Sequence, residues 1–113
     1  STTAMFAAML EGRPGFDEVL LFNERGEVTE FSRGNAVFEI DGVLVTPPES
    51  SGRLRGLALD SMLQAGEVSE RAISVQEALA AQQAWLVNSV VGRREVTLMA
   101  EIDAFPTAEL SAR

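Results

Sequence analysis

The stretch GEVTEFSRGNAVFEIDGVLVTPP, residues 26–48, alternates polar and apolar residues in the way that paired β-strands do. The dipeptide Asp41-Gly42 within it is a favoured two-residue hairpin turn. The segment EVLLFN just upstream is compact and apolar, which is also typical of a strand. Together these patterns predict an antiparallel meander of four strands, at residues 18–23, 27–32, 35–40 and 43–46.

Helices are expected at three places. Residues 2–11, rich in Ala and Met, predict a short helix that ends at Gly12. After the loop PPESSG, apolar residues recur at helical spacing from Leu57 and stop before Gly66. Ser74 and Glu77 then form an S-x-x-E capping box, which predicts another helix through about residue 81.

The remaining apolar segments predict further strands, at residues 67–73, 84–88 and 94–102. The tail from Phe105 onward carries only weak signals. Strands therefore dominate, with two or three short helices between them. This pattern favours a single α+β domain over residues 1–113, with a mostly antiparallel sheet.

Composition excludes several classes of function. The formal net charge is −8 and the pI about 4.4, so the chain is a poor nucleic-acid binder. No apolar run approaches the roughly 20 residues that span a bilayer, and no signal peptide is evident. We therefore expect no membrane partner and a cytoplasmic location.

The residue types that are missing limit the chemistry further. The sequence contains no His, Cys, Lys or Tyr. The usual general base, thiol nucleophile, Schiff-base amine and zinc ligands are therefore all absent. A serine nucleophile would lack a base, a carboxylate pair for glycoside hydrolysis lacks a positioned partner, and no carboxylate spacing indicates a metal site. The chain alone is not expected to perform covalent chemistry.

Glu30, Arg33 and Asn35 form the first candidate site. They follow one another at the end of a predicted strand, where Glu30 could accept a hydrogen bond from a cationic ligand. The plainer interpretation is an exposed salt bridge with an Asn in a turn, and spacing alone favours this one.

Two further segments could bind an anion. In SSGRLRGLALD, residues 50–60, a loop with Gly56 leads into a helix, whose free N–H groups and dipole attract anions. In WLVNSVVG, residues 85–92, Ser89 follows a buried-looking strand and offers a hydroxyl and an N–H. The alternatives are an ordinary loop-to-helix junction and an ordinary turn. Trp85, Phe38 and Met62 are interpreted as core residues.

The order and separation of these segments resemble a known family. The runs DEVLLFNERGEVTEFSRGN, DGVLVTPPESSGRLRGL and GEVSERAISVQEALAAQQAWLVNSVVG are similar to the carboxyl-terminal domain of class IV aminotransferase-like enzymes. These are fold-type IV pyridoxal-phosphate proteins, among them branched-chain and D-amino-acid aminotransferases and aminodeoxychorismate lyase. The resemblance covers residues 2–96 and implies a mostly antiparallel sheet that forms a partial barrel.

The resemblance assigns roles to particular residues. It implies that Glu30 bonds the protonated pyridine nitrogen of pyridoxal 5′-phosphate in the intact enzyme. It implies that the backbone of Leu57 and Ala58 holds the phosphate, that Ser89 also contacts it, and that Asn35 fixes the loop. Ala58 replaces the usual hydroxyl, and Leu59 replaces an arginine that is common in the family.

The family's Schiff-base lysine position is occupied by Ser1, so no catalytic residue is assigned in this chain. Within the family the later motifs look most like aminodeoxychorismate lyase, possibly the lyase part of a fused 4-aminobenzoate synthase. That activity forms 4-aminobenzoate and pyruvate in folate synthesis. The runner-up is a branched-chain or D-amino-acid aminotransferase.

The third alternative is a degenerate binding domain without cofactor. The resemblance also implies a missing amino-terminal domain that supplies half the cleft, a small-molecule substrate and a homodimer. The fragment by itself is expected to show no turnover.

Overall fold

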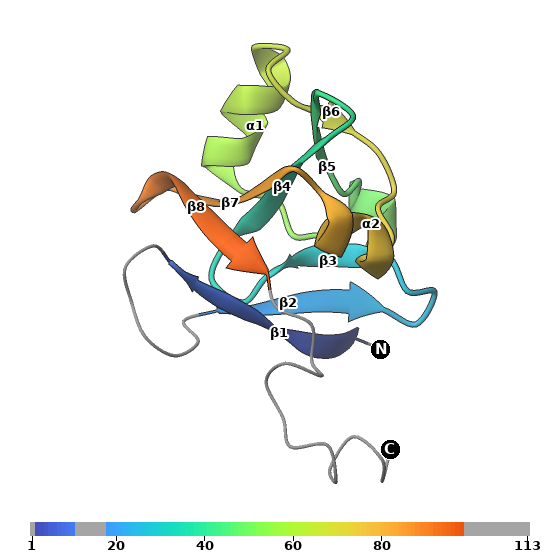
Figure 1. Ribbon diagram of the computed structural model, residues 1–113. Coiled ribbons are helices and arrows are strands. Elements are labelled where there is room, and N and C mark those ends of the chain that lie inside the picture. The colour runs from blue at the N-terminus through green and yellow to red at the C-terminus, as the bar shows by residue number, and fades with distance from the viewer. Residues whose placement is uncertain (1, 11–17, 99–113) are drawn as a thin grey trace, which may run out of the picture.

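The computed structural model describes residues 2–10 and 18–98, with eight strands joined in one sheet (Figure 1). The strand order is β3-β2-β1-β8-β7-β4-β5-β6, and every pairing except β5 with β6 is antiparallel. The strands are β1 (Thr2–Leu10), β2 (Glu18–Asn23), β3 (Val28–Phe31), β4 (Asn35–Ile40), β5 (Val43–Thr46), β6 (Ser69–Glu70), β7 (Gln83–Asn88) and β8 (Gly92–Leu98). The predicted α+β class with a mostly antiparallel sheet is confirmed.

The predicted amino-terminal helix is wrong, because residues 2–10 form the strand β1. Its backbone pairs with β2 on one side, from Thr2 opposite Asn23 to Ala7 opposite Glu18, and with β8 on the other. Two neighbouring strands satisfy the backbone of this segment, and this tertiary pairing outweighs the helix propensity of Ala and Met. Gly12, the predicted helix stop, lies outside the described residues.

The four strands of the first half exist, but they do not form one meander. β2 pairs with β3 and β4 pairs with β5, whereas β3 is not paired with β4, and only an isolated bridge joins Phe31 to Gly34 in the turn between them. β4 is already flanked by β5 and β7, so neither of its edges is available for β3. The predicted turn at Asp41-Gly42 is confirmed, with φ of 54° and 79° at its two residues.

Two α-helices and one 3₁₀ helix complete the fold: α1 (Leu57–Gln64), α2 (Val75–Ala80) and η1 (Glu49–Ser51). The predicted capping box is present, because Ser74 Oγ accepts the Glu77 N–H and Glu77 Oε1 accepts the Ser74 N–H, both at 3.0 Å. The strand predicted at residues 67–73 is reduced to β6. Residues 99–102 of the last predicted strand, and the tail from Phe105, lie outside the described residues. None of the helices in the described residues is long and apolar enough to cross a membrane.

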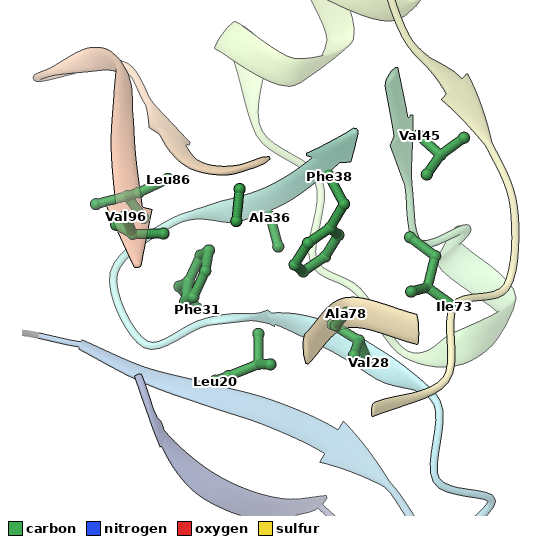
Figure 2. Packing of buried hydrophobic residues seen from close by; sticks show 11 residues of the cluster. Leu20, Val28, Phe31, Ala36, Phe38, Val45, Ile73, Ala78, Leu86 and Val96 are labelled. Carbon is green, nitrogen blue, oxygen red and sulfur yellow. The ribbon is translucent and has the colours of Figure 1, made fainter. Parts of the chain in front are cut away.

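The buried side chains form two clusters on opposite faces of β4. Phe38 and Ala36 point into the larger cluster, which lies between the sheet and α2 (Figure 2). Val37, the residue between them, packs into the smaller cluster with Val87 of β7 and Leu59 of α1. Because side chains alternate along β4, Val37 points to the face opposite Phe38. Its cluster with Leu59 and Val87 holds α1 against β4 and β7.

Candidate functional site

A pocket of about 390 Å³ lies where three separate segments meet. The end of β3 and the turn after it contribute Glu30 and its neighbours, the start of α1 contributes Leu57 and Ala58, and the end of β7 contributes Ser89. All four residues that the sequence analysis proposed for cofactor binding line this pocket. The fold thus brings together segments that are up to about 60 residues apart in the sequence.

The Glu30 carboxylate is half-buried at the pocket wall and binds a backbone group. Its Oε1 accepts a hydrogen bond of 2.7 Å from the Leu54 N–H, in the loop that leads to α1. This bond fixes the carboxylate relative to the loop. The sequence analysis considered an exposed salt bridge within the group Glu30, Arg33 and Asn35. In the structure, Arg33 instead pairs with Glu18 of β2.

Glu18 of β2 has a fully buried side chain beneath the β3–β4 turn. Its Oε1 accepts hydrogen bonds from Ser32 Oγ at 2.8 Å and from the Arg33 N–H at 3.1 Å, and its Oε2 pairs with Arg33 Nε. The sequence analysis missed this partner, because Glu18 precedes Arg33 by 15 residues and reads as the first polar residue of an apolar strand.

Asn35 is buried at the start of β4 and fixes the loop before α1. Its Nδ2 donates to the Leu54 carbonyl at 2.9 Å, so the Leu54 residue is held through its N–H by Glu30 and through its C=O by Asn35. Gly56 packs directly against the same amide. A Cβ at position 56 would lie 2.3 Å from Asn35 Oδ1, well inside van der Waals contact. In this wall of the pocket, Glu30 and Asn35 therefore fix the position of Leu54, and Gly56 leaves the space that Asn35 needs.

Arg53 secures the other side of this loop. Its side chain is only 1% exposed, and it donates to the Pro47 carbonyl and to Glu70 Oε2, both at 2.6 Å. A buried guanidinium needs such partners, because burying a charge without them is costly. The loop from residue 47 to the start of α1 is consequently anchored in two places.

The amino terminus of α1 presents backbone N–H groups at the pocket. Its N-cap is Gly56, so no side chain caps the helix, and the first helical bond runs from the Asp60 N–H to the Gly56 carbonyl at 2.9 Å. The N–H groups of Leu57 and Ala58 precede that bond. With the positive end of the helix dipole they form a donor set suited to a phosphate or carboxylate. The Leu59 side chain is buried in the core and does not line the pocket.

The end of β7 is tied to the β3–β4 turn. Asn88 Nδ2 donates to the Arg33 carbonyl at 2.9 Å, while its Oδ1 accepts the N–H groups of Val90 at 2.9 Å and Val91 at 2.8 Å. Gly34 allows the close approach, since a Cβ there would lie 2.7 Å from the Val87 carbonyl oxygen. Ser89 is thereby held at the pocket edge with its side chain exposed.

A metal centre has no ligand set in the part of the chain that the structure describes. No group of three or more His, Cys, Asp or Glu side chains there could hold an ion. The chemistry that the pocket offers is one carboxylate, backbone N–H groups, the hydroxyls of Ser32 and Ser89, two asparagine amides, and the arginines Arg33 and Arg55. Such a set can bind a molecule that combines a cationic group with anionic groups.

Residues 3–99 match the sequence pattern of the family described as amino-transferase class IV. The chain belongs to the class IV aminotransferase family. A search of curated proteins found no match.

Solved structures agree with this membership of the class IV family. A protein assigned as an amino-acid aminotransferase from Mesorhizobium loti is 36% identical with a TM-score of 0.68, over 74% of this chain and 41% of that one. The branched-chain amino acid aminotransferase of Thermobaculum terrenum, solved in its PLP-form, is 27% identical with a TM-score of 0.68, over 74% and 29%.

A protein assigned as a 4-amino-4-deoxychorismate lyase from Legionella pneumophila is 26% identical with a TM-score of 0.66, over 85% of this chain and 39% of that one. The present chain therefore spans less than half of the length of each of these three proteins. Pyridoxal phosphate is accordingly the cofactor implied for intact members of the family.

Proposed function

We propose that the pocket binds pyridoxal 5′-phosphate, with Glu30 at the ring nitrogen and the N–H groups of Leu57 and Ala58, with Ser89, at the phosphate. The observation that carries this proposal is the meeting of these residues, from three segments, around one pocket of about 390 Å³. Each matches one part of the cofactor: a carboxylate for a cation, and helix-start donors with a hydroxyl for a dianion.

The local geometry supports this orientation. Glu30 is held by the Leu54 N–H, and the same loop continues two residues later into the start of α1. The acid and the phosphate donors are thus fixed relative to one another by a short, doubly anchored loop. When bound, the cofactor supplies an electron-accepting pyridinium ring, and the carboxylate of Glu30 favours its protonated form.

For the intact protein we propose aminodeoxychorismate lyase activity, which converts 4-amino-4-deoxychorismate to 4-aminobenzoate and pyruvate. The support is the motif resemblance in residues 67–92 and the similarity to the Legionella protein. An aminotransferase is the second candidate, favoured by the higher identity to the Mesorhizobium protein. Since Ser1 stands where the family has its lysine, we expect no turnover from these residues alone.

We further propose that another part of the intact protein, the amino-terminal domain, covers the pocket, and that the protein is a homodimer. Three large apolar side chains at or beside the pocket support a covered mouth: Leu54 is 69% exposed, Leu57 78% and Val90 91%. Apolar side chains gathered at one site on a surface commonly mark a contact area.

Calorimetric titration with pyridoxal 5′-phosphate, and with pyridoxine 5′-phosphate, which has no aldehyde, tests the cofactor site. The chain has no lysine, so non-specific Schiff bases on lysine cannot produce the signal. We expect saturable binding of both ligands and about tenfold or greater weakening in Glu30→Gln, because a charge-assisted hydrogen bond contributes about 1.5–3 kcal/mol.

Glu95→Gln is the matched control, because it removes the same charge from an exposed position of β8 that does not line the pocket. Its affinity should equal that of the wild type. Equal affinity of Glu30→Gln would refute the role of Glu30. Absence of saturable binding in the wild type would refute cofactor binding by this chain and favour the degenerate domain.

A further inference from the structure

Glu18 is a fully buried carboxylate that takes no direct part in the proposed cofactor site. Its side chain is 0% exposed and it does not line the pocket. Both of its oxygens accept bonds from the β3–β4 turn, where the donors are Ser32 Oγ, the Arg33 N–H and Arg33 Nε. Taking a carboxylate out of water is costly even when it is paired. Stability alone is therefore a weak reason for an acid at this position.

The β3–β4 turn is attached to β2 through Ser32. The Ser32 N–H donates to the Val19 carbonyl at 2.9 Å, and Ser32 Oγ accepts the Val19 N–H at 3.2 Å. The same hydroxyl donates to Glu18 Oε1 at 2.8 Å. Ser32 thus connects the first two residues of β2, and Glu18 completes the attachment by accepting the next N–H of the turn, that of Arg33, at 3.1 Å.

Glu30 and Asn35 lie on either side of this turn, and both bind the same residue. Glu30 Oε1 accepts the Leu54 N–H at 2.7 Å, and Asn35 Nδ2 donates to the Leu54 carbonyl at 2.9 Å. Asn35 begins β4, which has a sheet neighbour on each side, whereas Glu30 lies in the four-residue edge strand β3, paired only with β2. A shift of the turn should therefore move Glu30 more than Asn35.

The start of α1 has supports that do not pass through the turn. Arg53 ties the preceding loop to the Pro47 carbonyl and to Glu70. Leu59 anchors the helix in the smaller buried cluster. Loss of Glu18 should therefore disturb the ring side of the proposed site and leave its phosphate side in place.

We propose that Glu18 is a positioning residue of the cofactor site, which holds the β3–β4 turn through Ser32 and Arg33 and thereby directs the Glu30 carboxylate at the ring nitrogen. This inference rests on the proposed cofactor site and adds to it a residue from outside the pocket. Glu18 acts only through the turn, because it does not line the pocket. A hydrogen bond weakens steeply as its distance and angle depart from the optimum, so a small shift of Glu30 is sufficient.

Two ligands separate the positioning of Glu30 from general damage to the fold. Pyridoxine 5′-phosphate has the ring nitrogen, whereas its deaza analogue has a C–H group in that place and keeps the hydroxyls and the phosphate. Calorimetry gives the dissociation constants of the chain for both. We expect the wild type to bind the pyridine ligand roughly tenfold more tightly, as a charge-assisted hydrogen bond provides, and Glu30→Gln to lose this preference.

Glu18→Met removes both acceptor oxygens and keeps an unbranched side chain of similar length. It should reduce the preference to about threefold or less and leave the affinity for the deaza analogue within about twofold of the wild type. Ser32→Ala breaks the same attachment without changing a charge and should lower the preference in the same direction. Ser74→Ala is the matched control, because this hydroxyl caps α2 and does not line the pocket, and it should keep the full preference.

Urea unfolding verifies that each variant is folded, and Ser32→Ala decides the test if Glu18→Met does not fold. A full preference in the folded variants at these two positions would overturn the inference, as would equal weakening of both ligands or an equal loss of preference in Ser74→Ala. In each of these cases the wild-type preference and its loss in Glu30→Gln would still support the cofactor site. A wild type that binds both ligands equally, or neither, would refute the role of Glu30 and this inference with it.

Discussion

Gly56 is the position where the pocket wall is most sensitive to one added methyl group. Its φ of −138° and ψ of 139° are accessible to alanine, so the backbone by itself tolerates the substitution Gly56→Ala. The added Cβ, however, would lie 2.3 Å from Asn35 Oδ1, about 1 Å short of ordinary contact. The buried Asn35 amide must therefore shift, which breaks or strains its 2.9 Å bond to the Leu54 carbonyl.

The cost follows from these contacts. If the Asn35 amide stays in place, overpacking the buried site costs about 1–3 kcal/mol; if the amide moves away, the buried Leu54 carbonyl is left without its donor, at a similar cost. Replacing glycine by alanine at a compatible position returns about 0.4–1 kcal/mol through the unfolded state. We expect Gly56→Ala to lower the free energy of unfolding by about 1–2 kcal/mol.

A double-mutant cycle with Asn35→Ala isolates the clash. Once the amide is absent, Gly56→Ala should cost nothing or stabilise slightly, so the two substitutions are strongly coupled. The assay is urea unfolding followed by the fluorescence of the single tryptophan, Trp85, which packs against the cluster that holds α1. An equal cost of Gly56→Ala in both backgrounds, or no cost in the wild type, would refute the reasoning.

Two further substitutions test the supports around the site. Arg53→Met should lower the free energy of unfolding by about 1–3 kcal/mol, because it leaves the Pro47 carbonyl without its donor. Arg71→Met, which removes an exposed ion pair, is the control and should cost about 0–1 kcal/mol. Similar urea midpoints for the two variants would contradict this. The Ser74 N–H, with help from Arg71, lowers the pKa of Glu77 below its ordinary value of 4.5. The stabilisation by the charged carboxylate is therefore complete above about pH 4.5 and lost as the pH falls through the lower folded-state pKa. The difference in unfolding free energy between the wild type and Glu77→Gln should be largest at pH 6 and shrink as the pH is lowered below 4.5, and a difference that does not change with pH would contradict the assignment.

Local patterns in the sequence were sufficient for most individual elements. Alternation and turn chemistry predicted β2, β4 and β5 with their observed bounds, and the hairpin at Asp41-Gly42. The capping box at Ser74 and Glu77 predicted the start of α2. These features depend on residues within one turn or one strand of each other, so the sequence contains all of the interactions that decide them.

Pairing between distant segments was not visible in the sequence. Residues 2–10 have helix-favouring composition but form β1, because β2 and β8 supply backbone partners on both edges. β3 and β4 are consecutive in sequence but separated in the sheet, because β7 occupies the edge of β4. The energy of such pairing depends on which strand is near, and no local pattern records that.

The candidate site, too, was predicted in part from the sequence, while the rest of it became visible only in the tertiary structure. Residue types alone marked Glu30, the loop and helix start at residues 50–60 and Ser89 as possible ion-binding positions, because a carboxylate and a helix start have intrinsic affinity for ions. The resemblance to the class IV family then implied cofactor-binding roles for Glu30, Leu57, Ala58 and Ser89. Only the tertiary structure decided that these residues line one pocket and that Asn35 grips Leu54. Only the tertiary structure, too, showed that Arg33 is held by the buried Glu18. A hydrogen bond requires its two atoms within about 3 Å, and that proximity between distant segments is set by the packing of the whole sheet.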